Sequence, residues 1–304
     1  MKFILFAVWL FLLYNPAAAQ RKFDSLVYSR NTEKLEGLVP TYYTPGYRLE
    51  AEKYKSAFEK AIHFYEASYP GHFVLKLAIM DSAQWLKEIC PYGYLNYDSG
   101  WAMIPAKMSY GSLLRLYGIE NKREKLDSLL IENNVTSEEL VSSIFLVYSL
   151  HELGHYFVLD LNRTTIPDMF ANELIATYFS LNYFKSTNSR DLSNLILFSN
   201  FISQNYHPKF HKIKDIDSLY TNMTVQNFKW YHCNIVLLCN EIYKLEGSSF
   251  IQYYLNLFSK KINNSFTTGE IISLLDKGAN NIVSKWAQQL DSKNVAGDSK
   301  KRLP

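Results

Sequence analysis

The sequence predicts an α+β fold that is mostly helical, with a small β-sheet near the N-terminus and a helical C-terminal lobe. Residues 72–80 and 100–106 are short apolar segments typical of strands, whereas apolar residues at helical spacing dominate after residue 109. Only 12 glycines and 9 prolines occur in 304 residues, which argues against a fold of many strands joined by tight turns.

The composition indicates a folded chain of nearly neutral charge. Apolar residues make up 48% and charged residues 20%, so the chain can bury a large core. Lysine and arginine number 32 against 29 aspartates and glutamates. This small excess excludes the broad basic field that nucleic-acid binding requires, so we expect no nucleic acid as a partner.

Residues 1–19 have the pattern of a cleaved signal peptide. Lys2 gives a cationic start, residues 3–14 are an unbroken apolar run, and the alanines at 17–19 form a small-residue cleavage site. Twelve helical residues rise about 18 Å, short of the roughly 30 Å bilayer core, and no later segment is apolar enough to span it. The sequence therefore predicts a secreted or periplasmic protein with no membrane span after signal cleavage.

The remaining elements follow in order along the chain. Helices are expected at residues 49–69, 113–117, 122–132, 137–159, 169–183, 191–206, 227–245, 250–260 and 268–290. The polar connector at 162–167 suggests a boundary between an N-terminal lobe, residues 20–160, and a helical C-terminal lobe, residues 161–290. A polar tail, residues 291–304, follows.

The sequence leaves the state of its three cysteines open. Within one helix, Cys233 and Cys239 would lie roughly 9 Å apart along the axis, too far for a disulfide. Any intrachain disulfide would therefore involve Cys90. The alternative is three buried free thiols.

The helix expected at 137–159 contains the motif that carries chemistry, His-Glu-Leu-Gly-His at residues 151–155. His151 and His155 share one helix face, so both imidazoles can bind one metal ion at about 2.0–2.1 Å. Glu152 is rotated by roughly 100°, where it can border the ion and accept a proton from water. The flanking residues are apolar on nearly every side, so a divalent cation would offset the cost of burying Glu152.

Gly154 supports a buried helix. A glycine inside a helix costs roughly 1 kcal/mol relative to alanine, which is tolerable if a neighbouring element or a ligand approaches its backbone closely. The alternative interpretation of the motif is a pair of core histidines beside an incidental glutamate.

A catalytic zinc needs a third protein ligand and one open position. Glu173 is the preferred candidate, because its neighbours three and four residues away on the next helix are uncharged. Asp168 is the alternative ligand. Asp160 is turned roughly 140° away from His155 on the same helix, which makes ligation awkward.

These residues resemble the gluzincin branch of zinc metallopeptidases, which includes the thermolysin-like and aminopeptidase-N-like families. The resemblance covers residues 144–180 and rests on His151-Glu152-x-x-His155 followed by Asn172-Glu173 on a second helix. It implies a zincin-like fold, Zn2+ held by both histidines and Glu173, and Glu152 as the general base that activates a zinc-bound water. It also implies a peptide or protein substrate, cleaved by an endopeptidase.

The chain also departs from that branch. Residues 100–106 resemble the edge strand that pairs with extended substrates, but the segment lacks the glutamate with which aminopeptidase-N-like enzymes hold an amino terminus, so aminopeptidase activity is not expected. Thr177 replaces the aspartate that thermolysin-like enzymes place four residues after the ligand glutamate. The residue that orients the histidines by hydrogen bonding to their other ring nitrogen is therefore not assigned.

The developing oxyanion needs a donor besides zinc. Tyr231 and His232 are the candidates, and the alternative is that both are core aromatic residues of a helix. The functional prediction is a secreted zinc-dependent metallopeptidase. A noncatalytic zinc-bound binding or scaffold protein and a metal-free helical interaction protein are the alternatives.

Overall fold

The computed structural model describes residues 24–25, 27–69, 71, 73–81, 96–98, 100–162, 164, 167–219, 223–258 and 266–292. The expected signal peptide, Cys90 and residues 293–304 of the polar tail lie outside these residues. The fold is of the α+β class and mostly helical, with a small N-terminal sheet, as predicted. The chain divides into two compact units, Met1–Met108 and Ser109–Pro304.

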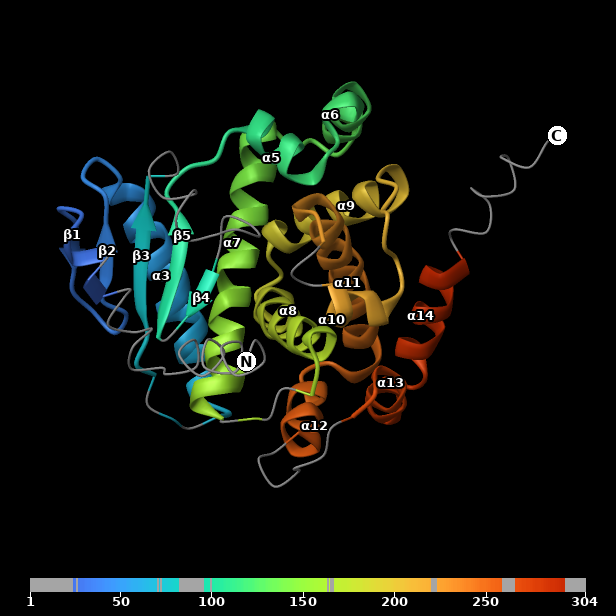
Figure 1. The fold of residues 1–304 in the computed structure, drawn as a ribbon. Coiled ribbons are helices and arrows are strands. Elements are labelled where there is room, and N and C mark those ends of the chain that lie inside the picture. Colours follow the sequence, from blue (N-terminus) through green and yellow to red (C-terminus); the bar gives the residue numbers. More distant parts are fainter. Residues whose placement is uncertain are drawn as a thin grey trace, which may run out of the picture. The chain divides into compact units, whose positions relative to one another are not determined.

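The first unit contains a five-stranded sheet in the order β1-β2-β3-β5-β4 (Figure 1). Its strands are β1 (Glu33–Leu35), β2 (Thr41–Tyr43), β3 (Lys76–Met80), β4 (Asn96–Asp98) and β5 (Trp101–Pro105). The three central strands run parallel, and β1 and β4 pair antiparallel at the two edges. All five residues of β5 are buried, which fits a central strand covered on both faces.

The sheet corrects one expectation about substrate binding. Residues 100–106 were expected to form an edge strand, but β5 lies between β3 and β4. The chain reverses at Gly100, whose φ of 82° is in the left-handed region, and β4 pairs with Trp101–Met103. Much of the hydrogen-bonding edge of β5 is therefore occupied by β4.

Helix α3 (Arg48–Glu66) confirms the helix predicted from the aromatic stripe that begins at Tyr54. Its buried face includes Tyr54, Phe58, Ile62 and Tyr65. The strands predicted at 72–80 and 100–106 are present as β3 and β5. Strands β1, β2 and β4 were not predicted, because three residues are too few to show an alternating pattern.

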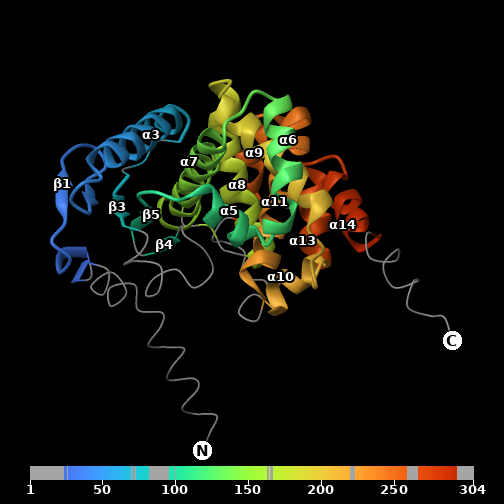
Figure 2. The same cartoon turned by 90° about the horizontal axis from the view of Figure 1, so that it is seen from above.

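The second unit is helical in its described residues. Its helices are α5 (Tyr110–Tyr117), α6 (Arg123–Glu132), α7 (Ser137–Tyr156), α8 (Met169–Ser186), α9 (Arg190–Asn205), α10 (Ile213–Leu219), α11 (Val225–Glu246), α12 (Ser249–Leu257), α13 (Thr268–Lys277) and α14 (Ile282–Ser292). Helix α7 packs against α8 and α9, and α11 packs against the same two helices (Figure 2). A π-helical turn, Phe157–Leu161, extends α7.

Two expectations about the helical region differ from the structure. The helix predicted at 268–290 is divided into α13 and α14, with Asn280 and Asn281 at positive φ between them. The expected lobe boundary at residue 160 separates α7 from α8, whereas the structure places both helices in one unit, because their apolar faces pack on each other. None of the described helices is long and apolar enough to cross a membrane.

Candidate metal centre

Three helices carry the candidate site, and a side chain caps the start of each one. Thr136 and Glu139 form a capping box at α7, with reciprocal hydrogen bonds of 3.1 and 2.9 Å. The Asp168 carboxylate accepts a hydrogen bond from the backbone N–H of Ala171 at 2.7 Å, and Thr224 caps α11 in the same way. These caps fix where each helix begins, and hence which face each later residue occupies.

The predicted ligands come together between α7 and α8. The Oε2 atom of Glu173 lies 3.2 Å from His151 Nε2 and 3.8 Å from His155 Nε2. The donor atoms of these three residues all lie within 4.8 Å of one another. We call this group the His-His-Glu cluster; it is buried, and it could hold a metal ion.

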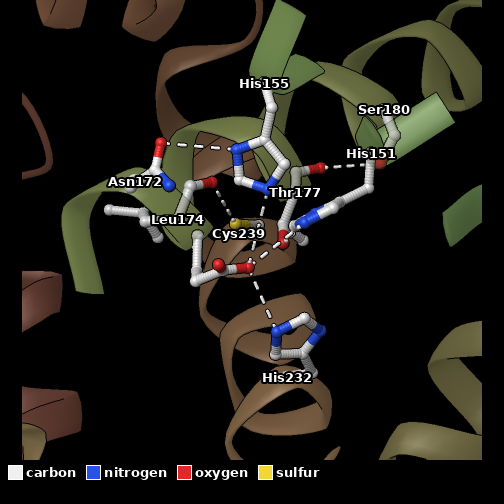
Figure 3. Close-up of polar contacts among 9 residues, drawn as sticks. His151, His155, Asn172, Leu174, Thr177, Ser180, His232 and Cys239 are labelled. Carbon is white, nitrogen blue, oxygen red and sulfur yellow. Dashed lines mark hydrogen bonds and ion pairs between the residues drawn. The ribbon is translucent and has the colours of Figure 1, made fainter. Parts of the chain in front are cut away.

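In His151 and His155, the ring nitrogen farther from Glu173, Nδ1, contacts a side chain of α8 (Figure 3). His151 Nδ1 lies 3.1 Å from Thr177 Oγ1, and His155 Nδ1 lies 3.3 Å from Asn172 Oδ1. The tautomer that carries its proton on Nδ1 and donates it to these oxygens leaves Nε2 able to bind a cation. Thr177, which stands where the resembled enzymes have an aspartate, and Asn172 are thus the partners of the histidines that sequence reasoning left unassigned.

Gly154 lets α7 and α8 approach closely enough for these contacts. A β-carbon on Gly154 would lie 2.7 Å from the carbonyl oxygen and 2.9 Å from the α-carbon of Ala176. Gly154 thus has a close backbone neighbour, the condition under which its cost in the helix is tolerable. Any larger residue would push α8, with Glu173, away from the histidines.

Burial keeps the imidazoles neutral, and the neighbouring imidazoles keep the carboxylate charged. Burial lowers the pKa of His151, and burial together with the charge of His151 lowers the pKa of His155 to about 4. Burial alone would raise the pKa of Glu173, but its contacts with His151 and His232 outweigh that effect and hold the pKa well below its usual range. At neutral pH the cluster thus offers two neutral imidazoles and one carboxylate, a donor set that suits a divalent cation.

An unsatisfied oxygen atom of Glu173 also indicates that the three side chains could hold a cation. Glu173 Oε2 is buried and has no hydrogen-bond partner of acceptable geometry, despite the nearby imidazole nitrogens. A buried carboxylate oxygen without a proton donor is costly. A cation bound between this oxygen and the two Nε2 atoms would remove that cost.

The structure separates the two oxyanion candidates. The hydroxyl of Tyr231 donates a hydrogen bond to the carbonyl of Lys212 at 2.8 Å, so the structure does not place this candidate donor at the cluster. His232 instead places Nε2 3.1 Å from Glu173 Oε2. The two residues are consecutive on α11 and therefore point in directions roughly 100° apart, and only His232 faces the cluster.

The alternative ligands lie elsewhere. Asp168 caps α8 through Ala171, and Asp160 is exposed on the π-helical turn. Neither belongs to the group of side chains that could hold a metal among the described residues. Glu152, the predicted general base, is 9% exposed on α7 next to His151. Cys233 and Cys239 are buried free thiols.

A large cavity in the helical unit lies away from the cluster. It has a volume of about 560 Å³ and is lined by residues of α9, α11 and α14, among them Asn200, Leu238 and Trp286. None of the cluster residues lines it. This cavity is therefore not the place where a substrate would meet the histidines.

Comparison of the sequence with models of known protein families gives no match, and comparison with curated proteins gives none either. The chemistry of the site is therefore argued from its geometry. Two imidazole nitrogens and one carboxylate, held by two packed helices and oriented by Thr177 and Asn172, can bind a divalent metal ion and leave coordination positions for other ligands.

Proposed function

We propose that the chain is an exported zinc-dependent metallopeptidase. One observation carries the proposal, the convergence of His151, His155 and Glu173 on one buried point with both histidines oriented through Nδ1. Three nitrogen and oxygen ligands are typical of catalytic zinc, whereas structural zinc usually has four protein ligands. Export follows from the N-terminal sequence pattern.

A zinc ion held by His151, His155 and Glu173 would supply the Lewis acidity that makes a water nucleophilic near neutral pH and polarises the scissile carbonyl. Glu152 lies one residue from His151 on α7, so its carboxylate can border the same ion. It takes the proton from the attacking water and returns it to the leaving amine. His232, on the other side of Glu173, is the available donor for the developing oxyanion.

Metal analysis together with peptide cleavage tests this proposal. The purified mature chain should contain about one zinc per molecule and should cleave members of a peptide library. Glu152→Gln should keep the zinc but lose about 100-fold or more in kcat, because the general base is removed. Glu138 is exposed in the first turn of the same helix, so Glu138→Gln should leave the zinc content and kcat unchanged. Full activity in the Glu152→Gln variant would exclude this mechanism.

The burial of the cluster favours a second candidate, a noncatalytic protein in which the metal stabilises the helices. The side chains of His151, His155 and Glu173 are only 2%, 11% and 6% exposed. This candidate predicts stoichiometric metal and a large loss of stability with a chelator, but no cleavage of any peptide. Turnover that depends on Glu152 would exclude it.

A further inference from the structure

We infer that His232 is a fourth, exchangeable protein ligand of the proposed metal, so that the resting site is closed and opens when another ligand displaces this imidazole. The inference rests on the proposed function, because it concerns the same ion. His232 would occupy the fourth, catalytic position only in the resting site, and once displaced it would be free to act as the oxyanion donor considered above.

The distance between His232 and Glu173 is that expected of two ligands on one ion. His232 Nε2 lies 3.1 Å from Glu173 Oε2, slightly closer than His151 Nε2 at 3.2 Å and much closer than His155 Nε2 at 3.8 Å. With bonds of 2.0–2.1 Å, neighbouring ligands of a tetrahedral zinc lie about 3.3 Å apart. The distances from Glu173 Oε2 to the Nε2 atoms of His232 and His151 are therefore both close to the spacing of two zinc ligands.

The contact between His232 and Glu173 lacks the geometry of a good hydrogen bond. Both nitrogens of His232 and the Oε2 atom of Glu173 are buried without a hydrogen-bond partner of acceptable geometry. Two buried polar atoms that lie 3.1 Å apart without a well-aligned hydrogen bond both remain unsatisfied, which is costly. A cation bound by both atoms would satisfy them and remove that cost.

Two features make His232 the ligand that can leave. Its Nδ1 has no hydrogen-bond partner, whereas Thr177 and Asn172 hold the other two histidines. His232 is also not in the group of donor atoms that all lie within 4.8 Å of one another. Its side-chain torsions must therefore change when it binds the metal. A metal-ligating histidine without an outer partner is weakly oriented, and its exchange is correspondingly easy.

The surroundings of His232 allow the ring to be replaced without emptying the core. Its imidazole packs on the ring of Phe228 at a centroid distance of 4.3 Å and on that of Tyr148 at 5.8 Å. Phenylalanine at residue 232 keeps this aromatic packing and removes the ligand atoms. His232→Gln provides a second variant, and His207→Gln, an exposed change in the same unit, is the matched control.

The test uses the mature chain loaded with Co2+, with X-ray absorption to count imidazoles and visible spectra to follow ligand exchange. The wild type and His207→Gln should show three imidazoles, and His232→Phe should show two and bind Co2+ about tenfold or more weakly. Azide should displace one imidazole from the wild type. It should bind His232→Phe about tenfold or more tightly, with no change in imidazole count, since no histidine must leave.

Each contrary result has a distinct meaning. Two imidazoles and equal Co2+ affinity in the wild type and in both His232 variants would overturn the inference and leave the proposed function intact. Three imidazoles that persist when azide binds would overturn exchangeability. A wild-type chain that takes up neither Co2+ nor Zn2+ would refute the proposed function itself.

Discussion

Gly154 of α7 lies against the backbone of Ala176 of α8, so closely that a β-carbon at residue 154 would be 2.7 Å from the Ala176 carbonyl oxygen. The histidines lie on either side of this contact in sequence, and Glu173 lies three residues before Ala176. The distance between the two helix backbones therefore determines whether the carboxylate reaches the imidazoles. The packing of these two small residues is therefore part of what forms the candidate metal site.

Gly154→Ala should consequently damage both stability and metal binding. Alanine favours the helix by up to about 1 kcal/mol over glycine, but overpacking against a rigid backbone costs about 1–3 kcal/mol. We expect a net loss of stability in urea denaturation and a weaker zinc affinity. Gly111→Ala in α5 is the control, because a β-carbon there meets nothing within 4 Å. A Gly154→Ala variant with unchanged zinc affinity would show that the close approach does not matter.

Thr177→Val should weaken metal binding while preserving the core. The variant removes the oxygen that faces His151 Nδ1 but keeps the size of the side chain. Loss of such an outer partner typically lowers metal affinity by about 10–100-fold. Ser180→Ala is the matched control, since the Ser180 hydroxyl donates only to the backbone carbonyl of Thr177. Competition with a zinc-sensitive dye measures both variants, and Thr177→Ser should restore most of the affinity.

Glu173→Gln should lower zinc affinity by more than about 100-fold, because the anionic ligand becomes a neutral amide. This loss is larger than the one expected when only a hydrogen-bond partner of a ligand, such as Thr177, is removed. Equilibrium dialysis against buffered zinc measures the change. Glu241→Gln, an exposed carboxylate on α11 paired with Lys244, should bind zinc like the wild type. Equal affinity in the Glu173 and Glu241 variants would remove Glu173 from the ligand set.

Sequence reasoning singled out the three members of the His-His-Glu cluster because their positions depend on local spacing. Residues 151 and 155 share a face of any helix, and Glu173 was conspicuous among uncharged neighbours. The choice between Tyr231 and His232 depends instead on the rotation of α11 about its axis. Residues 227–236 of that helix are all buried, so no polar face indicates the rotation.

The hydrogen-bond partners of His151 and His155 could not be predicted from the sequence, for a related reason. Asn172 and Thr177 meet His155 and His151 only because α7 and α8 cross at Gly154 and Ala176, which is a property of tertiary packing. The central position of β5 was also missed. The three-residue strand that covers its edge, β4, has too few residues to be recognised in sequence.

The metal-free chain should lose stability as the pH falls from about 6.5 to about 4. Burial and the nearby His151 hold the pKa of His155 at about 4 in the folded state, whereas the unfolded chain has the ordinary value of about 6.5. Between these values the unfolded state binds a proton that the folded state does not. The free energy of unfolding therefore decreases with acidification, by at most about 1.4 kcal/mol per pH unit for this group.

Urea denaturation in the presence of a chelator at pH 7, 5.5 and 4.5 measures this dependence. The stabilising contribution is fully present above pH 6.5 and is lost on the way down to pH 4. His151 and His232 also have lowered pKa values caused by burial, so His155→Gln should reduce the slope without abolishing it. Zinc should move the loss to lower pH, because protons must then compete with the metal for the same Nε2 atoms. Stability that is flat or rises on acidification would contradict neutral, buried imidazoles at this site.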